Sequence, residues 1–230
     1  MLKLSPRIQM AADMVRRGRT VCDVGTDHAY LPSYLILNGI SPRAVAGDIG
    51  EGPLKNAAKS VKIYGVEEKV KLRLSDGLDN IGEDEADEII ICGMGGNLIA
   101  DILSRAEWLR NPDKHIIAQP MSHAEDVRRF LCENGFEIEE ERVCEDDGRL
   151  YLALSAYYTG EKKEYSPGFY YRGLLLKNGD ALSKKYFEKH YTRVKKRIAG
   201  IEGKDAFLEE YTALKAAADD IEKEFENAES

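Results

Sequence analysis

The feature that most constrains this sequence is a regular alternation of short apolar runs and amphipathic segments over residues 1–135. Each run has the length of a buried strand, and each following segment has the period of a helix with one apolar face. Such alternation requires a mostly parallel sheet with right-handed crossovers. The predicted strands are residues 21–24, 43–48, 70–74, 88–92 and 115–118.

The alternation then stops. Residues 136–144 and 150–158 read as two strands joined by a turn at 145–148, which contains Asp-Gly. An α/β sheet that ends in an antiparallel hairpin is the outline of a class I methyltransferase, whereas dehydrogenase folds usually continue with parallel units. The predicted fold is therefore α/β, a Rossmann-like parallel sheet closed by an antiparallel hairpin.

A different period follows a linker at 157–163 and a short helical segment at 170–176. Apolar residues then recur every three or four positions in two stretches that are separated by residues 200–205. Their members are Phe187, Tyr191, Val194, Ile198 and Ile201, then Phe207, Tyr211, Leu214, Ala218, Ile221 and Phe225. This spacing predicts an antiparallel, coiled-coil-like helical hairpin. We expect two domains, residues 1–158 and 159–230.

The stretch at 20–32 carries the first sign of a ligand. Its predicted strand ends in Asp23-x-Gly25 and leads into a helix, which places a glycine where backbone approaches a ligand. Dinucleotide binding needs three glycines, but Asp27 and His28 stand where the others would fall. Two carboxylates beside the turn would repel a pyrophosphate and suit a ligand with a positive end. S-adenosylmethionine, with its ammonium and sulfonium groups, is such a ligand.

The other predicted strands also end in polar or glycine-rich residues, and the carboxyl ends of parallel strands meet at one edge. Asp48 can accept hydrogen bonds from ribose hydroxyls, and Asp76 can accept one from an adenine amino group. Each residue alone is commonly a turn or a cap, but their order along the chain favours a cofactor site. The residues expected to bind the cofactor are Asp23, Gly25, Asp27, His28, Asp48, Ile49, Asp76, Gly77 and Gly93.

Six segments together resemble the bacterial tRNA adenine-N1 methyltransferases that modify adenosine 22 in the D-arm. The segments are LSPRIQMAADMV, DVGTDHAYLP, AGDIGEGP, SDGLDNI, CGMGG and QPM. The resemblance covers essentially the whole chain, and it implies methyl transfer from S-adenosylmethionine to adenine N1 of tRNA. This sequence departs from the family at Asp48, where glutamate is often expected, and at Met121, where asparagine is common.

The resemblance also suggests where the target base lies. Adenine N1 has an in-plane lone pair and needs no strong base, but its methylated product is cationic, so the enzyme must expose the base and stabilise charge. Asp27 and Tyr30 are the catalytic candidates, although Tyr30 could equally be a packed aromatic residue. The residues expected to line the base pocket are Met94, Gly95, Gly96, Gln119 and Pro120.

The charge distribution points to the part of the chain that could hold RNA. The whole net charge of −8 lies in residues 1–158, and residues 159–230 are balanced. Within the second part, residues 184–197 hold seven bases and one acid. We expect Arg193, Lys196 and Arg197 to contact tRNA phosphates. The alternative is that these bases pair with acids of the second helix, namely Glu209, Glu210 and Glu222.

Several features restrict the remaining possibilities. No apolar run approaches the roughly 20 residues of a membrane span, and residues 1–15 lack a signal peptide's apolar core. The four scattered cysteines indicate reduced thiols and no zinc framework, so we expect a cytoplasmic protein without a metal ion. We also expect a monomer. Two alternatives stay open: a methyltransferase with a small-molecule, protein or different RNA substrate, and a non-catalytic nucleotide-binding regulator that dimerises through its heptads.

Overall fold

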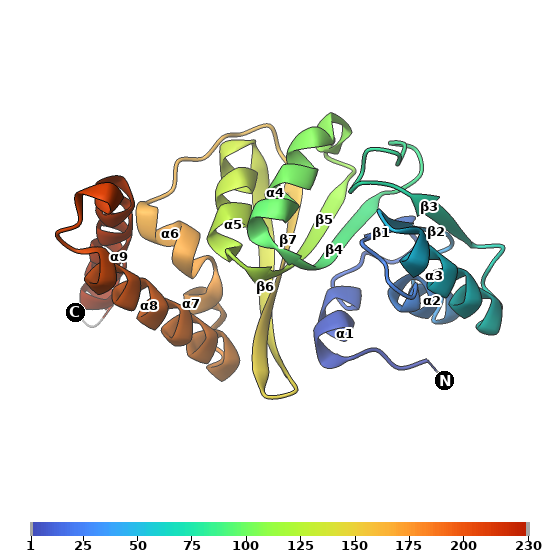
Figure 1. Ribbon diagram of the computed structural model, residues 1–230, viewed down its shortest axis with the longest axis horizontal. Helices are drawn as coiled ribbons and strands as arrows, with labels where there is room; N and C mark the ends of the chain where they lie inside the picture. Colours follow the sequence, from blue (N-terminus) through green and yellow to red (C-terminus); the bar gives the residue numbers. More distant parts are fainter. Residues whose placement is uncertain (1, 229–230) are drawn as a thin grey trace.

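The computed structural model describes residues 2–228, and the side chains of residues 2–224. In this part of the chain seven strands form one sheet in the order β3-β2-β1-β4-β5-β7-β6 (Figure 1). The strands are β1 (Val21–Val24), β2 (Ala44–Asp48), β3 (Val70–Leu74), β4 (Glu88–Gly95), β5 (His115–Ser122), β6 (Phe136–Asp146) and β7 (Arg149–Tyr158). β1 to β5 pair in parallel, and β7 lies antiparallel between β5 and β6. The predicted α/β sheet with a closing hairpin is confirmed.

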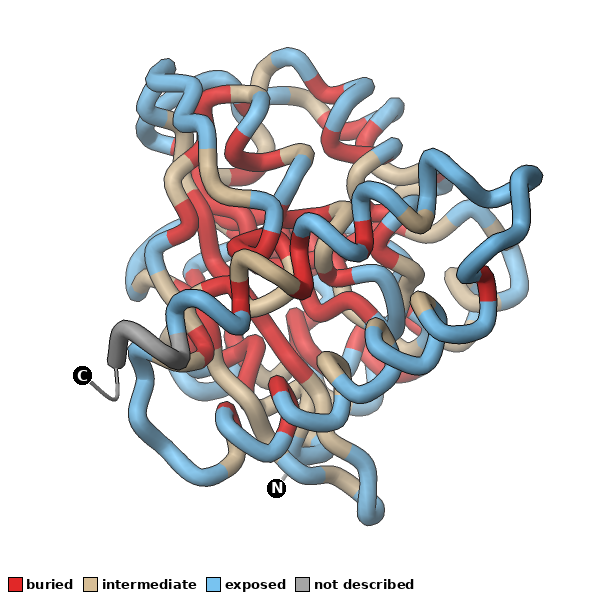
Figure 2. The backbone as a smooth tube through the Cα atoms, turned by 90° about the vertical axis from the view of Figure 1, so that its left-hand side faces the viewer, coloured by how far each residue is buried: buried red, intermediate tan, exposed pale blue. Residues whose placement is uncertain are grey.

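Helices cover both faces of the sheet, and their apolar sides form two clusters with the central strands. α4 (Gly96–Arg105) and α5 (Ala124–Glu133) pack on one face. α1 (Pro6–Ala12), α2 (Tyr30–Leu37) and α3 (Glu51–Ile63) pack on the other. Because β1, β4 and β5 are covered on both sides, their residues form the buried band through the centre of Figure 2.

β4 and β5 are longer than predicted. β4 continues from Cys92 to Gly95 and β5 continues from Ala118 to Ser122, with register shifts around Met94. The glycines and the proline that suggested turns are instead accommodated by the irregular pairing. Two apolar residues of the helices, Ala58 on α3 and Leu98 on α4, are exposed.

The sequence Ser122-His123-Ala124-Glu125 has the pattern of a capping box, which predicts a helix start at Ser122, but this prediction is wrong. Ser122 is the last residue of β5, paired with Gly95, and α5 begins at Ala124 after His123. His123 has a left-handed backbone and no side-chain cap hydrogen bond. Pairing with β4 therefore overrides the local capping pattern.

The predicted helical hairpin is present as α8 (Ala181–Ile201) and α9 (Leu208–Ala228). Ahead of it lie two short helices, α6 (Pro167–Arg172) and α7 (Leu175–Asn178), where the sequence suggested one. α9 packs against α6 as well as α8, and the backbone N–H of Gly168 donates to Asp220 at 3.0 Å. The predicted stripe is buried at Phe187, Ile201, Leu214, Ala218 and Ile221, and the side chain of Phe225 lies outside the described residues. A coiled-coil geometry stays a prediction.

A buried ion pair joins these helices to the sheet. Arg128 of α5 and Glu141 of β6 are almost fully buried, with Nε and Oε1 2.6 Å apart. Arg128 Nη1 also donates to the carbonyl of Tyr170 at 2.8 Å, and Glu141 Oε2 accepts from the backbone N–H of Leu174 at 2.9 Å. The pair therefore fixes α6 and the start of α7 against α5 and β6.

None of the helices in residues 2–228 has the length and apolarity that a bilayer crossing requires. The same residues contain no cluster of three or more histidine, cysteine, aspartate or glutamate side chains arranged to hold a metal ion.

Candidate functional site

The turn from β1 into α2 is shaped by backbone that a side chain would obstruct. The N–H groups of Gly25 and Thr26 both donate to the carbonyl of Gly47, at 2.8 and 2.9 Å. Gly25 has φ of +77°, and a Cβ placed there would lie 2.2 Å from the Met94 methyl carbon. The turn after β1 and the end of β4 are therefore in contact, as expected if residues at the carboxyl ends of both strands bind one ligand.

Asp23 is the most unusual acid at this edge. Its side chain is only 7% exposed and hydrogen-bonds to Thr26. Burial is the main cause that raises the pKa of Asp23 from 3.8 to about 6; the Thr26 hydrogen bond opposes the rise, and the nearby carboxylate of Asp48 adds to it. A buried carboxylate with a raised pKa at a ligand-binding edge is typical of a functional group.

Asp48 lies at the end of the neighbouring strand and is partly exposed. Its Oδ1 accepts from the backbone N–H of Gly50 at 2.8 Å, which orients the carboxylate. Oδ2 has no hydrogen-bond partner among the described residues. Ile49, next to it, is 71% exposed, so both side chains are available to a ligand.

Asp27, His28 and Tyr30 form an exposed group at the start of α2. His28 Nε2 lies 3.2 Å from Asp27 Oδ2, and the His28 and Tyr30 rings stack with their centroids 5.0 Å apart. Tyr30 also meets Tyr64 edge-on at 6.4 Å, and it remains 43% exposed. Tyr30 is therefore a packed aromatic residue that a second molecule can still reach.

Asp76 and Gly77 follow β3 at the far side of the edge. Arg105 of α4 lies between Asp76 and Asp79, with its Nη2 3.3 Å from Asp76 Oδ1. The Asp76 side chain stays 56% exposed. Gly77 packs closely on Ile102, and a Cβ there would lie 2.8 Å from that side chain. Asp76 is thus reachable by a ligand, whereas Gly77 also has a packing role.

The ends of β4 and β5 form the other wall. Gly96 is buried, and a Cβ there would lie 1.9 Å from the His123 carbonyl oxygen, so this glycine permits the β4–α4 turn to meet the β5–α5 turn. Gln119 is fully buried, and Met121 beyond it is 48% exposed. Cys92 lies on the same wall, but burial raises the pKa of its thiol and keeps it neutral.

Arg7 is a site residue that sequence reasoning missed. Its Nη1 donates to Gln119 Oε1 at 3.2 Å, and it lies 3.7 Å from the position of a Cβ on Gly93. The guanidinium also lies over the Tyr151 ring at 5.7 Å. Arg7 lies in LSPRIQMAADMV, one of the six segments that carry the family resemblance. However, only the packing of α1 against the sheet brings its side chain to the ends of β4 and β5.

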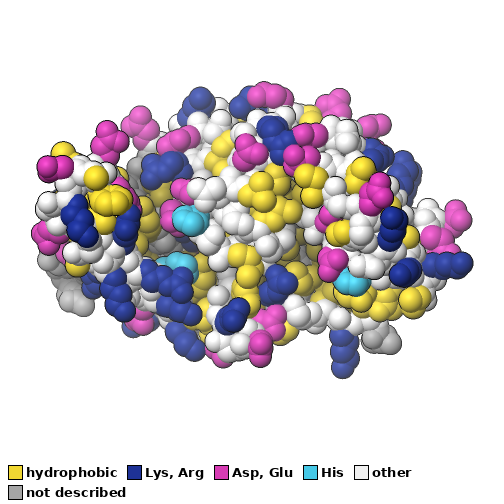
Figure 3. All heavy atoms as spheres, in the orientation of Figure 1, with side chains coloured by type: hydrophobic (Ala, Val, Ile, Leu, Met, Phe, Trp, Pro, Cys, Tyr) yellow, Lys and Arg dark blue, Asp and Glu magenta, His cyan; other side chains and the backbone are white. Residues whose placement is uncertain are grey.

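The basic residues of α8 fall into two groups. Arg197 makes two contacts of 2.7 Å with Glu210 and lies over the Phe207 ring, so for this residue the predicted pairing with the second helix is observed. Arg193 and Lys196 are exposed and have no ion-pair partner in the described part of the chain. Figure 3 shows basic side chains gathered over α8 at the lower left of this face.

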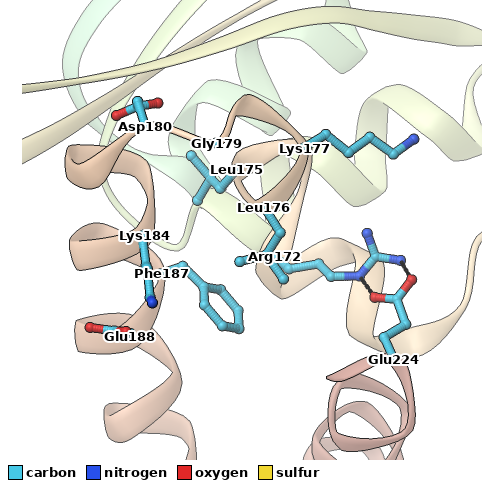
Figure 4. Close-up of a pocket in the computed structure, with 10 residues that line it drawn as sticks. All are labelled: Arg172, Leu175, Leu176, Lys177, Gly179, Asp180, Lys184, Phe187, Glu188 and Glu224. Carbon is cyan, nitrogen blue, oxygen red and sulfur yellow. Dashed lines mark hydrogen bonds and ion pairs between the residues drawn. The ribbon is translucent and has the colours of Figure 1, made fainter. Parts of the chain in front are cut away.

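A separate cavity of about 700 Å³ lies among α6, α7, α8 and α9 (Figure 4). Leu175, Leu176 and Phe187 line it, and an ion pair between Arg172 and Glu224 closes one side. None of its lining residues comes from the strand ends. It is therefore not part of the site described above.

The comparisons with known proteins agree with this arrangement. A family model described as a methyltransferase domain matches residues 4–154. The chain is 39% identical over 155 residues to the tRNA (adenine(22)-N(1))-methyltransferase of Bacillus subtilis. The aligned residues cover 67% of this chain and 65% of that protein. In that alignment the chain spans slightly less than two thirds of the curated relative's length.

Two solved structures are similar over nearly the whole chain. The B. subtilis M1A22 tRNA methyltransferase TrmK has a TM-score of 0.84 and 32% identity, covering 96% of this chain and 97% of that one. Streptococcus pneumoniae Sp1610, a putative tRNA (m1A22) methyltransferase in complex with S-adenosyl-L-methionine, has a TM-score of 0.78 and 31% identity. It covers 94% of this chain, and all of that chain is matched. The similarity to both structures includes the C-terminal helices.

Proposed function

We propose that this chain methylates adenine N1 of tRNA at position 22, because it belongs to the methyltransferase family and, within it, to the bacterial tRNA (adenine-N1)-methyltransferases. S-adenosylmethionine is the methyl donor. The observation that carries the proposal is the row of strand-end residues at one edge of the sheet, with Asp23 buried at its centre. The similar S. pneumoniae structure is a complex with that cofactor.

The strand-end residues fit this cofactor. When bound, S-adenosylmethionine supplies a methyl group on a sulfonium. Asp23 and Gly25 suit its charged amino-acid end, and Asp48 presents an unpartnered Oδ2 for a ribose hydroxyl. Asp76 can accept from the adenine amino group, with Ile49, Gly77 and Gly93 beside the ligand. Melting the protein with S-adenosylmethionine and with NAD separates this proposal from a dinucleotide site, because only the true ligand raises the melting temperature.

The target base is held on the other side of the same edge. Met94, Gly95, Gly96 and Pro120 line its pocket. Arg7 holds Oε1 of Gln119, which leaves Nε2 as the donor of that amide. Asp27 accepts from the N6 amino group and stabilises the positive charge that develops on the ring, and the exposed Tyr30 positions the base through a hydrogen bond from its hydroxyl. These roles require no strong base, because the N1 lone pair is already available.

The first prediction concerns these two catalytic candidates. Asp27→Ala should lower kcat on the order of 100-fold, since it removes an electrostatic partner of the transition state. Tyr30→Phe should lower it about 10-fold, the effect of one lost hydrogen bond. Single-turnover methylation of a tRNA transcript measures both, and calorimetry with S-adenosylmethionine serves as the control. If either variant loses only cofactor affinity, that residue belongs to the cofactor site instead.

The proposal extends to the roles of the two domains, the cellular location and the oligomeric state. Residues 1–158 form the catalytic domain, and residues 159–230 form a helical domain that contacts tRNA through Arg193 and Lys196, whereas Arg197 of the predicted set is paired with Glu210. All four cysteines are free thiols, which suits a reducing cytoplasm. We propose that the protein acts there as a monomer, without a metal ion.

A further inference from the structure

Two adjoining hollows lie between the end of β5 and the side of α8. The first, of about 330 Å³, is lined by Pro120, Met121 and residues 149–152 together with α8. The second, of about 220 Å³, is lined by residues 122–125 and α8. Both are bordered by Tyr186, His190 and Arg193, so they adjoin, and we call the two hollows together the α8 groove.

The α8 groove carries positive charge with little to balance it. Arg149 at the start of β7 and Lys189 and Arg193 on α8 line the first hollow, which has no acidic residue in its wall. None of the three has an ion-pair partner among the described residues, and all three are exposed. Glu125 is the one acid that lines the second hollow. Uncompensated cations that converge on a depression are typical of a site for anions.

The aromatic rings of the groove are neutral and flat. Tyr186 and His190 stack with centroids 4.2 Å apart, and Tyr151 lines the same hollow. Burial first, and then the charges of Arg193, Arg128 and Lys189, lower the pKa of His190 to about 4, so this ring is uncharged at neutral pH. Neutral rings beside cations suit the mixed surface of an RNA strand, which presents bases and phosphates together.

The position of the groove defines which part of the RNA it would meet. It opens directly beside Pro120 and Met121, where β5 delivers its residues to the base pocket. An adenosine rotated out of a helix leaves the phosphates on either side of it displaced and accessible. Of the three α8 residues predicted to contact tRNA, Arg197 is paired with Glu210 and Lys196 lines neither hollow, so the groove shares only Arg193 with that set.

We propose that the α8 groove binds the sugar-phosphate backbone next to the target adenosine, with Arg149, Lys189 and Arg193 contacting its phosphates. The proposal rests on the proposed function. It deepens that function because it assigns these contacts to a junction between the two domains, where the helical domain sets the position of the RNA relative to the catalytic edge.

The test is a triple variant, Arg149→Gln, Lys189→Gln and Arg193→Gln, compared with a control of equal charge change. The control is Lys59→Gln, Lys62→Gln and Lys69→Gln, three exposed lysines of which two lie on α3 and one directly precedes β3. The dissociation constant of a tRNA transcript is measured from low to moderate salt, because each lost phosphate contact lowers the logarithmic salt slope by about 0.7–0.9.

The groove variant should lose about two units of salt slope and weaken tRNA binding on the order of 100-fold at low salt. The control should retain the wild-type slope, and both variants should keep the wild-type affinity for S-adenosylmethionine. A groove variant whose slope equals that of the control overturns the proposal. Wild-type protein that binds tRNA without methylating it overturns the proposed function alone, since the salt slopes still decide the groove; wild-type protein that does not bind tRNA overturns both.

Discussion

Replacing Asp23 with asparagine should make the free protein more stable at pH 8 and should weaken its binding of S-adenosylmethionine. The folded protein retains the Asp23 proton up to a pKa of about 6, whereas the unfolded chain releases it near 3.8. The stability contribution of the protonated form is therefore complete below pH 3.8 and is lost as pH rises through about 6. Asparagine has no such loss, so its free energy of unfolding at pH 8 should be higher by about 1–3 kcal/mol.

The same substitution removes a negative charge from the ligand's side of the site. A charge-assisted hydrogen bond contributes roughly 1.5–3 kcal/mol, so cofactor affinity should fall about 10- to 100-fold. Denaturant unfolding between pH 4 and pH 8 measures the first effect, and calorimetry at pH 8 measures the second. An Asp23→Asn variant with a lower free energy of unfolding than the wild type at pH 8 would show that the ionised carboxylate stabilises the fold. An unchanged affinity for S-adenosylmethionine would show that Asp23 does not bind the cofactor.

Replacing Arg128 with methionine should lower the free energy of unfolding by about 3–5 kcal/mol, the usual cost of leaving a buried charge without its partner. Arg128 and Glu141 are both nearly inaccessible to solvent, and together they hold the backbone at Tyr170 and Leu174. The double variant Arg128→Met with Glu141→Leu should recover part of that loss, because no unpaired charge remains. Full recovery is not expected, since the Tyr170 carbonyl and the Leu174 N–H lose their partners.

A neighbouring arginine supplies the control. Arg129→Met removes a partly exposed side chain that lies 3.7 Å from Glu133 and over the Tyr170 ring, and it should cost less than about 1 kcal/mol. Relative to the wild-type protein, the Arg128 variant should lose more affinity for tRNA than for S-adenosylmethionine, because α8 is positioned through α6 and α7. An Arg128→Met protein as stable as the Arg129→Met protein would contradict this account of the domain junction.

The sheet could be predicted from sequence because its information is local. Buried parallel strands are short apolar runs, and the hairpin turn at Asp147-Gly148 has two adjacent residues with left-handed backbone, as its sequence indicates. The ends of β4 and β5 could not be predicted in this way. Their last residues pair through an irregular register around Met94, so tertiary contacts decide a structure that the glycines and Pro120 locally disfavour.

The candidate site shows the same division. Asp23 and Asp48 lie at the ends of predicted strands and Asp76 just follows one, so the parallel topology alone places them at one edge. Arg7 reaches Gln119 only because α1 packs across the sheet, and no local pattern encodes that contact. The α8 groove likewise joins Arg149 to residues of α8 that are distant in the sequence. Heptad spacing places Arg197 outside the apolar stripe, but it does not show that this exposed side chain pairs with Glu210 across the helical hairpin.

The most direct test of the central claim is nucleoside analysis of tRNA that the purified protein has methylated. A transcript with adenosine at position 22 is incubated with S-adenosylmethionine, digested to nucleosides and analysed by mass spectrometry, beside a transcript with guanosine at that position. The account predicts 1-methyladenosine from the first transcript and no methylated nucleoside from the second. Methylation at another atom or another nucleotide, or equal methylation of both transcripts, would contradict it.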